Sequence, residues 1–483
     1  MLRTFAHPAE HQGQPGRVWL LAVLTCLLCL GSLVLFSPWI DNPEYWPAIG
    51  VGAGIVSLAI IGVLRLFGFG WHSAPVVYIA FVWMFHFPMA LFIHIVPDLW
   101  TQVSAQIYGW TQTASWYRAA FYALLCVIAF AIGCLAVAPR RRDETVAVEP
   151  NMLRVQVGTA TGLAGLGWLY FLMFRAGGLD LFGSGYAQLY NTVFGADFAT
   201  AVFLVSVGCF LTLMNAPRRL VWLPIALQLA GSVPVLLTGS RQFALIGPLV
   251  LAVLAVRRGI RLGLASTAIS CALMLWLISY VGQSRSHGVM AGVVEGQSVS
   301  PIGALVEMGG SLETTSMALD WIDNGDSYLL GGSYWLPFER GLGLVLPLRS
   351  NLETDPRAMN MVMVSRIGGL GGSAVAESYY NFSVFGTLFF VALGMLLAHI
   401  DRGSAQNGGS VATSALGVVL YAFLFQARNW FISVPLFVIL GLAPLAACLC
   451  LEAMQRRRRS AGAARDTLLP DLRTTIFPGR THV

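Results

Sequence analysis

Residues 116–142 read WYRAAFYALLCVIAFAIGCLAVAPRRR, an apolar run that ends in three consecutive arginines. A helix needs about 20 mostly apolar residues to cross the hydrocarbon core of a bilayer, and this run is long enough. Arginine-rich loops mark the cytoplasmic side of a membrane protein. The stretch therefore predicts a transmembrane helix whose C-terminal end faces the cytoplasm.

The composition extends this pattern over the whole chain. Of the 483 residues, 57% are hydrophobic and only 11% are charged, against roughly 25% charged residues in soluble domains. An ordinary cytosolic enzyme is excluded, and an all-α polytopic membrane protein is predicted. The seventh and eighth apolar segments are short and close together, so a re-entrant pair is the alternative there. We expect about 12 transmembrane helices, over residues 18–37, 47–68, 75–97, 116–138, 155–173, 198–215, 220–238, 243–257, 262–282, 374–399, 411–427 and 431–452.

The basic residues set the predicted orientation. All 29 are arginine, and 20 of them fall on the cytoplasmic side if the N-terminus is inside. An even number of spans returns the C-terminus to the cytoplasm as well. The net charge of +6 therefore reflects the inner surface and gives no indication of a nucleic-acid partner. The cytoplasmic set is Arg3, Arg17, Arg65, Arg140, Arg141, Arg142, Arg154, Arg218, Arg219, Arg257, Arg258, Arg261, Arg402, Arg456, Arg457, Arg458, Arg459, Arg465, Arg473 and Arg480.

The predicted spans divide the chain into segments. Within the longest loop, 302–322 has apolar residues at helical spacing and predicts an interfacial helix. Gly and Pro in 331–347 predict an ordered loop instead of a helix. Together with the Gly- and aromatic-rich segment 174–197, this loop is expected to cover a site at the outer face. The segments are a cytoplasmic N-terminal segment (1–17), spans 1–9 (18–282), a large external loop between spans 9 and 10 (283–373), spans 10–12 (374–452) and a basic cytoplasmic tail (453–483).

The cysteines and the short motifs give no sign of a metal or a cofactor. All eight cysteines fall within apolar spans, so neither a disulfide framework nor a thiolate metal site is indicated. The sequence contains no HExxH, P-loop or GxSxG element, which leaves metal hydrolase, ATPase and serine hydrolase chemistry without support.

Two external arginines sit in tight turns between predicted spans: Arg241 in TGSRQ (238–242) and Arg428 in QARNW (426–430). An arginine near hydrocarbon is costly unless it reaches water or a partner, and its planar guanidinium suits bidentate binding of phosphate. Either these arginines extend to water at the interface, or they bind an anion such as the diphosphate of a lipid carrier.

Three histidines are placed where they could take part in chemistry. His86 and His94 are eight residues apart on one predicted helix, hence on a similar face; a proton relay and a packed core position are both open. His287 lies near the external mouth beside Arg285. It could be a general base near neutral pH, or an exposed loop histidine.

Three stretches resemble one family of membrane enzymes. They are TGSRQFALIGPL (238–249), in which Arg241 and Leu245 form an Arg-xxx-Leu turn, SYLLGGSYWLPFERGLGLVLP (327–347) and GGLGGSAVAESYYNFSVFGTLFFVALGMLLAHIDR (368–402). Together they resemble the oligosaccharide repeat-unit polymerases, or O-antigen polymerases, and are similar to the related O-antigen ligases. One departure is Ser383, because the family usually has Gly after Asn-Phe.

The resemblance implies a metal-independent, lipid-carrier-dependent glycosyltransferase of GT-C type in a bacterial inner membrane. Its active site would face the periplasm, where it would transfer a growing glycan from undecaprenyl diphosphate to the next carrier-linked repeat unit. The implied partners are that lipid-linked oligosaccharide, the bilayer, a chain-length-determining co-polymerase and a flippase. No cofactor and no nucleic acid are implied.

This chemistry needs cations for the leaving diphosphate and a base for the acceptor hydroxyl. Arg241 is the first candidate for the cation. Glu377 and His287 are the candidate bases, although a carboxylate at the start of a helix is also favoured by the helix dipole alone. Further substrate contacts are expected from Arg428, Arg340, Arg366, Glu339, Tyr380 and Asn381.

Other functions stay open at this point. A ligase would use the same chemistry on a different acceptor. A 12-span secondary transporter would share the layout, but such transporters show two similar halves, and no internal repeat is evident here. A glycosyltransferase with an acidic pair in its first external loop would have to use Asp41 and Glu44, which are not adjacent.

Overall fold

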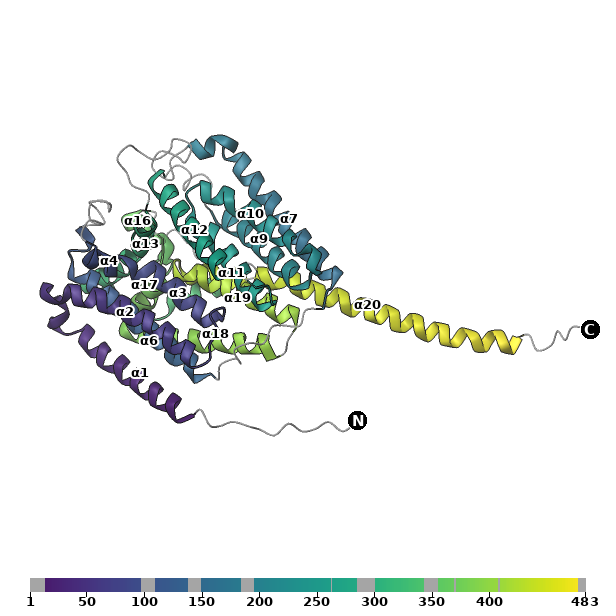
Figure 1. Ribbon diagram of the computed structural model, residues 1–483, viewed down its shortest axis with the longest axis horizontal. Helices are drawn as coiled ribbons and strands as arrows, with labels where there is room; N and C mark the ends of the chain where they lie inside the picture. Colours follow the sequence, from purple (N-terminus) through teal and green to yellow (C-terminus); the bar gives the residue numbers. More distant parts are fainter. Residues whose placement is uncertain are drawn as a thin grey trace, which may run out of the picture.

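The computed structural model describes residues 14–96, 109–137, 149–183, 195–261, 263–284, 300–342, 355–368, 371–406 and 409–476. These described residues form helices joined by turns, with no β-strand among them (Figure 1). The α-helices are α1 (Gln14–Leu35), α2 (Trp46–Leu66), α3 (Ala74–His86), α4 (Pro88–Ile95), α6 (Ala114–Ala136), α7 (Met152–Arg175), α9 (Ala196–Asn215), α10 (Trp222–Leu237), α11 (Arg241–Arg257), α12 (Leu264–Ser284), α13 (Pro301–Gly309), α14 (Leu312–Asp323), α15 (Gly332–Leu342), α16 (Met359–Ile367), α17 (Ala374–Phe382), α18 (Thr387–Gln406), α19 (Ser410–Ala427) and α20 (Val434–Ile476).

The described helices confirm most of the predicted spans, but not the count of 12. Ten helical segments are long and apolar enough to cross a membrane, and the bent pair α3–α4 makes up to eleven, among the residues that the structure describes. The eighth predicted span, 243–257, corresponds to α11, which has 17 residues and is about 26 Å long. It is short for a bilayer-spanning helix, and it carries Arg241 and Arg257 at its two ends.

The third predicted span is bent. α3 and α4 meet at Phe87 with an angle of 53°, because Pro88 has no N–H to continue the helix and its ring clashes with the preceding turn. The prediction that His86 and His94 share one helix face is therefore wrong: His86 ends α3, and His94 lies on α4.

Glycines allow two pairs of helices to pack backbone to backbone. A Cβ atom on Gly208 of α9 would lie 2.3 Å from the Gly162 nitrogen of α7. A Cβ atom on Gly394 of α18 would lie 2.2 Å from the Phe130 oxygen of α6. Small residues at such crossings are the usual means of helix association inside a membrane, where no hydrophobic force acts between helices. In Figure 1, α7 and α9 run side by side on one flank of the body.

The region predicted as a large external loop contains α13, α14, α15 and α16. The predicted helix over 302–322 is present as α13 and α14, with a break at Gly310–Ser311. The ordered loop predicted for 331–347 is wrong in its first part, since residues 332–342 form α15. The side chain of Asn381 accepts hydrogen bonds from the N–H groups of Gly331 and Ser333, and this capping from outside the segment stabilises a helix that Gly and Pro alone do not predict.

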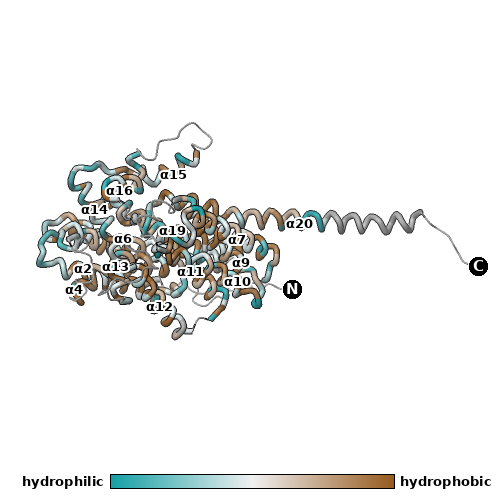
Figure 2. The backbone as a smooth tube through the Cα atoms, turned by 90° about the horizontal axis from the view of Figure 1, so that it is seen from above, coloured by the Kyte–Doolittle hydropathy of each residue, from teal (hydrophilic) through white to brown (hydrophobic). Residues whose placement is uncertain are grey.

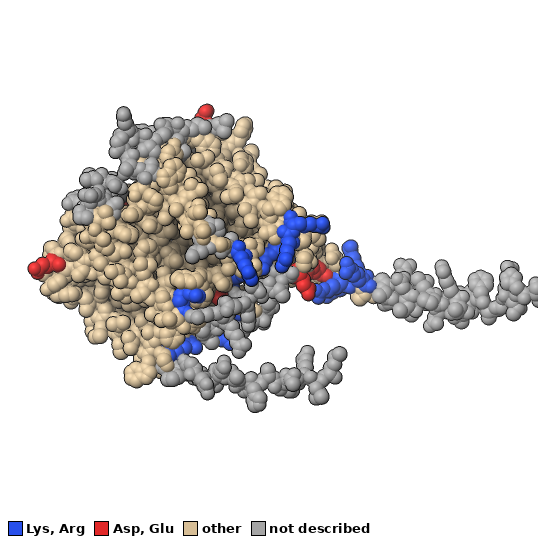
Figure 3. Space-filling model, viewed as in Figure 1, with Lys and Arg blue, Asp and Glu red and all other residues tan. Residues whose placement is uncertain are grey.

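Two ends of the helical body differ in their charged residues. The Arg-rich end carries Arg154, Arg257 and Arg456, and α20 leaves the body there (Figure 1). Arginines gather around that point in Figure 3, and α20 becomes hydrophilic just outside the body in Figure 2. The opposite end carries the C-terminus of α19, the N-terminus of α11 and the short helix α17. We call it the site end, because the resembling motifs meet there.

Candidate active site at the site end

Glu377 is held at both carboxylate oxygens. It lies in the first turn of α17 and is only 1% exposed. Its Oε1 accepts a hydrogen bond of 2.7 Å from the Ser333 hydroxyl, and its Oε2 accepts one of 2.7 Å from the N–H of Phe431. Ser333 belongs to α15, in the stretch 327–347, and Phe431 follows α19 just after Arg428. Both therefore contact the carboxylate of the stretch 368–402.

The start of α17 is fixed by a buried polar network. Ser373 is the N-cap residue, and its hydroxyl accepts hydrogen bonds from the N–H groups of Val375 and Ala376. His86 Nε2 lies 2.8 Å from the Ser373 hydroxyl, and His86 Nδ1 lies 3.0 Å from the Val82 oxygen. His86 is 0% exposed. It is therefore a packed histidine that supports the N-cap of α17, the helix that carries Glu377.

Asn381 ties α17 to the start of α15. Its Nδ2 donates to the Ser333 hydroxyl and to the Glu377 carbonyl oxygen, both at 2.7 Å. Its Oδ1 accepts from Gly331 and Ser333, as described above. Both ends of this buried amide are therefore satisfied, as buried polar groups usually are, and Asn381 orients Ser333 toward Glu377.

Arg241 opens α11 and is nearly buried, with 6% of its side chain exposed. Its Nη2 donates to Glu307 Oε1 of α13 at 2.6 Å. Gly282 of α12 leaves the space for this pair, because a Cβ atom there would lie 2.6 Å from Glu307 Oε2. The sequence alone does not single out Glu307, which is one acidic residue of the segment predicted to be external; its only signal is its place in an apolar helix close to a glycine-rich break.

The turns that carry Arg241 and Arg428 are joined directly. Asn429 Nδ2 donates to Gln242 Oε1 at 2.9 Å, and Gln242 Nε2 donates to the Phe425 oxygen at 3.0 Å. The Arg428 guanidinium lies over the ring of Phe85, 5.0 Å from its centroid. The chain is continuous from Arg428 to Phe431, which contacts Glu377, so the two basic turns and the carboxylate form one cluster.

The segment before α17 packs closely on the same turn. A Cβ atom on Gly372 would lie 2.6 Å from the ring of Trp430, and one on Gly371 would lie 3.4 Å from the Arg428 oxygen. Gly372 is thus needed for close approach. It brings the N-terminus of α17 against the turn after α19.

Tyr380 and Arg366 meet at one carboxylate on the outer side of the cluster. Asp326 Oδ2 accepts from the Tyr380 hydroxyl at 2.5 Å and from Arg366 Nη1 at 2.6 Å. Partial burial opposes ionisation of Asp326, but hydrogen bonds from Arg366 and Tyr380 outweigh it and lower its pKa. The Arg366 guanidinium also covers the ring of Trp321 at 4.5 Å.

Of the remaining predicted site residues, Glu339 and Arg340 are not part of the cluster around Glu377. Glu339 forms an ion pair of 2.7 Å with Arg357, which also pairs with Asp355 at 2.8 Å, and the hydrogen bonds from Arg357 lower the pKa of Glu339. Arg340 is exposed at the end of α15. His287 lies outside the described residues.

No metal ligand set is evident in the part of the chain that the structure describes. No group of three or more His, Cys, Asp or Glu side chains lies close enough there to hold a metal ion. The site is built from a buried carboxylate, hydroxyls, backbone N–H groups and guanidinium groups. Such groups can bind a polyanion and accept a proton.

Comparisons with known proteins show which family the chain belongs to. Protein CapE of Staphylococcus aureus is 24% identical over 174 residues, which are 35% of this chain and 37% of that protein. The chain thus spans little more than a third of the length of that relative. No solved structure matches the chain. Residues 52–456, which include every helix of the site described above, match the O-antigen polysaccharide polymerase Wzy. That match covers most of the chain, and the protein therefore belongs to the O-antigen polysaccharide polymerase Wzy family.

Proposed function

We propose that this protein joins lipid-linked oligosaccharide repeat units at the periplasmic face of a bacterial inner membrane. Family membership already makes the protein a polysaccharide polymerase in a membrane. The same family match argues against a secondary transporter. The observation that carries the finer proposal is the meeting of Arg241, Arg428 and Glu377, which come from three separate stretches, in one cluster at the end of the bundle opposite the Arg-rich end.

The reaction would proceed by direct displacement. The acceptor hydroxyl of one carrier-linked unit forms a bond to the anomeric carbon of the growing glycan. The bond from that carbon to the undecaprenyl diphosphate oxygen breaks, and its electron pair leaves with the diphosphate. The proton of the acceptor hydroxyl passes to a base. Cationic donors aimed at the leaving group lower the barrier, because charge develops there in the transition state.

Arg241 is the proposed cation for the leaving diphosphate. In the resting protein its guanidinium pairs with Glu307 at 2.6 Å, and this contact aims the planar fork before substrate arrives. A diphosphate is a stronger ligand for that fork than one partly exposed carboxylate, so the guanidinium would transfer from Glu307 to the substrate. Arg428 is the proposed second cation, and exposed Arg340 and Arg366 are proposed to contact the glycan portion from the outer side.

Glu377 is the proposed base. Both of its oxygens accept a hydrogen bond from the protein, which fixes its orientation and leaves lone pairs on each oxygen for a substrate hydroxyl. Tyr380, Asn381 and Glu339 are proposed to shape the acceptor subsite around it. His287 is the second candidate base. A larger loss of polymer on substitution of His287 than on substitution of Glu377 would assign the role of base to His287 instead.

The proposed orientation follows from the arginines. The arginine bias of the predicted topology supports an orientation with the Arg-rich end in the cytoplasm and the site end in the periplasm. With α11 counted as a short twelfth span, both termini lie in the cytoplasm. A co-polymerase that sets chain length and a flippase that supplies the repeat unit are the proposed partners.

Complementation of a deletion strain tests the proposal. Deletion should leave single repeat units in place of long polymer, and Arg241→Ala or Glu377→Gln should fail to restore long chains. Arg175→Ala is the matched control, because Arg175 is an exposed arginine at the end of α7 that belongs to none of the contacts above. Long chains at a normal protein level in the Arg241→Ala strain would refute the role of Arg241. Full-length polymer stranded on the lipid carrier after deletion would indicate a ligase instead.

A further inference from the structure

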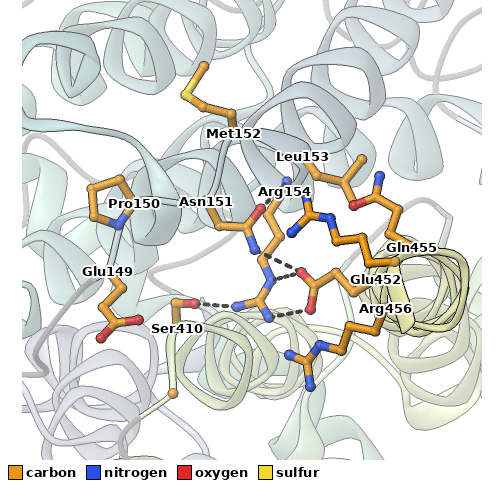
Figure 4. A pocket seen from close by; sticks show the side chains of 12 residues that line it. Glu149, Pro150, Asn151, Met152, Leu153, Arg154, Ser410, Glu452, Gln455 and Arg456 are labelled. Atoms are coloured by element: carbon orange, nitrogen blue, oxygen red, sulfur yellow. Dashed lines mark hydrogen bonds and ion pairs between the residues drawn. The ribbon is translucent and has the colours of Figure 1, made fainter. Parts of the chain in front are cut away.

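A polar pocket lies at the Arg-rich end, between the N-termini of α7 and α19 and the middle of α20 (Figure 4). Its volume is about 680 Å³, within the range of pockets that hold small ligands. It is separate from the candidate active site. From Ser410 to Arg428 along α19, and from Val434 to Glu452 along α20, the helices rise about 27 Å at 1.5 Å per residue. The pocket and the site thus lie about one hydrocarbon thickness apart.

The inner wall of the pocket is a compensated ion pair. Arg154 Nε and Nη2 donate to the two carboxylate oxygens of Glu452 at 2.6 and 2.8 Å. Asn151 Nδ2 donates to the same carboxylate at 2.9 Å, and Arg154 Nη1 donates to the Ser410 hydroxyl at 2.8 Å. Because Glu452 is bound in this bidentate way, its charge is neutralised where it stands, and it does not repel an anion from the pocket.

The open side of the pocket is cationic. Arg456 and Arg459 both line it, and their spacing of three residues puts them on one face of α20. Among the described residues, no carboxylate lies within ion-pair distance of either side chain. The exposed carboxylate of Glu149 is the only other acidic group in the lining. The N-termini of α7 and α19 add backbone N–H groups and the positive ends of two helix dipoles.

We infer that this pocket binds a phosphate group, supplied by an anionic phospholipid headgroup of the adjacent leaflet or by a soluble phosphate. Three features select that ligand: two adjacent guanidinium groups, two converging helix N-termini and, in the topology proposed above, a position at the cytoplasmic ends of the spans. Basic pockets between membrane helices on the cytoplasmic side are suited to anionic headgroups, and helix N-termini are suited to phosphate oxygens. The inference does not depend on the glycosyl transfer proposed above, since none of these residues belongs to that site.

Variants of neighbouring arginines test the inference on the full chain. The variant is R456Q with R459Q, and the matched control is R457Q with R458Q, which removes the same charge from the same turn of α20 but from side chains that do not line the pocket. All four arginines are exposed, so neither variant is expected to affect folding. The purified protein is placed in phosphatidylcholine nanodiscs, and its thermal midpoint is followed with added phosphatidylglycerol in one series and with added inorganic phosphate in another.

We expect phosphatidylglycerol, inorganic phosphate or both to raise the midpoint of the wild-type protein and of the R457Q/R458Q control. We expect R456Q/R459Q to need at least about tenfold more ligand for the same shift, because it loses charge-assisted hydrogen bonds to the phosphate. The arm that responds identifies the source. Equal losses in both variants would mean general attraction to a basic helix and would overturn the inference, as would the absence of any shift in the wild-type protein in both arms.

Discussion

The contact between Ser333 and Glu377 allows a direct test of how the carboxylate is held. Ser333→Ala removes the hydroxyl that donates to Glu377 Oε1 at 2.7 Å and accepts from Asn381 Nδ2 at 2.7 Å. The hydrogen bond from the Phe431 N–H to Oε2 stays. The substitution therefore frees one end of the carboxylate without removing it.

The size of the effect follows from these contacts. A hydrogen bond to a charged group contributes about 1.5–3 kcal/mol, and one between neutral groups about 1 kcal/mol. The Asn381 amide retains its bond to the Glu377 carbonyl oxygen, so the loss in stability is about 2–3 kcal/mol. A protein with about 5–15 kcal/mol of stability stays folded after such a loss. We expect polymer length to fall well beyond any drop in protein level, because the carboxylate is no longer fixed.

Two variants accompany Ser333→Ala. Ser333→Thr retains a hydroxyl and should restore most of the activity. Ser378→Ala is the control for a buried hydroxyl on α17 that bonds Tyr122 and the Val375 oxygen and does not touch the carboxylate. The assay is the chain-length distribution of polymer in a deletion strain, normalised to protein level, together with the thermal midpoint of the purified protein. Normal chain lengths for Ser333→Ala at a normal protein level would refute the view that orientation of Glu377 by Ser333 matters.

Three further predictions concern stability. Ser383 has φ 55° and ψ −141°, a region almost restricted to glycine, so Ser383→Gly should be more stable than Ser383→Ala by about 1–2 kcal/mol; equal thermal midpoints would show that the backbone there is unstrained. Burial raises the pKa of Glu313 to about 7. The folded protein therefore retains this proton while the unfolded chain loses it between about pH 4.5 and pH 7, and wild-type stability should fall over that interval as pH rises. Glu313→Gln should lessen the fall, and identical pH profiles of the midpoint would contradict the burial of this carboxyl. Gly208→Ala should cost about 3 kcal/mol because its Cβ would lie 2.3 Å from backbone, whereas Gly167→Ala, which meets nothing within 4 Å, should be neutral; a similar loss in both would argue against close packing of α7 on α9.

Much of the fold follows from local features of the sequence, because the length of an apolar run and the charge at its ends are local. The bend at Pro88 shows the limit: a continuous apolar run does not tell a straight helix from a broken one. α15 shows another limit, since its start is capped by Asn381, a residue 50 positions away from Gly331. Long-range capping of this kind overrides the local preference of Gly and Pro.

The site was predictable in part for the same reason. Arg241 and Glu377 stand next to the ends of predicted spans, and the structure gathers them into one cluster. Their partners are long-range: Glu307 is 66 residues from Arg241, and Ser333 is 44 residues from Glu377. Hydrophobic periodicity carries no information about such pairs, and a serine or glutamate in the long segment between the predicted spans 9 and 10 has no distinguishing neighbours in the sequence.

The arginines at the two ends of the bundle differ in how far water reaches their partners. At the Arg-rich end, several bind carbonyl oxygens near the ends of helices: Arg17 binds Leu135, Arg65 binds Phe69, and Arg258 binds Leu213 and Ala216. Two others there pair with carboxylates that are little exposed, Arg257 with Asp401 (1%) and Arg154 with Glu452 (12%). At the site end, the arginines pair with carboxylates, as Arg118 does with Asp41 and Asp323, Arg241 with Glu307, Arg357 with Glu339 and Asp355, and Arg366 with Asp326.

This difference has a functional consequence. A carbonyl oxygen capped by an arginine belongs to the backbone, so exchanging it for a soluble anion would expose a helix end. A carboxylate partner on a side chain can be exchanged for phosphate with little change in the backbone. Arginines that pair with exposed carboxylates are therefore already oriented, and their partner can still be exchanged. In the proposed mechanism, the cluster at the site end binds a diphosphate in this way without rebuilding the helices that carry it. Arg241–Glu307 combines a guanidinium that is 6% exposed with a carboxylate that is 36% exposed, so the partner that the proposed mechanism displaces is the one that water already reaches.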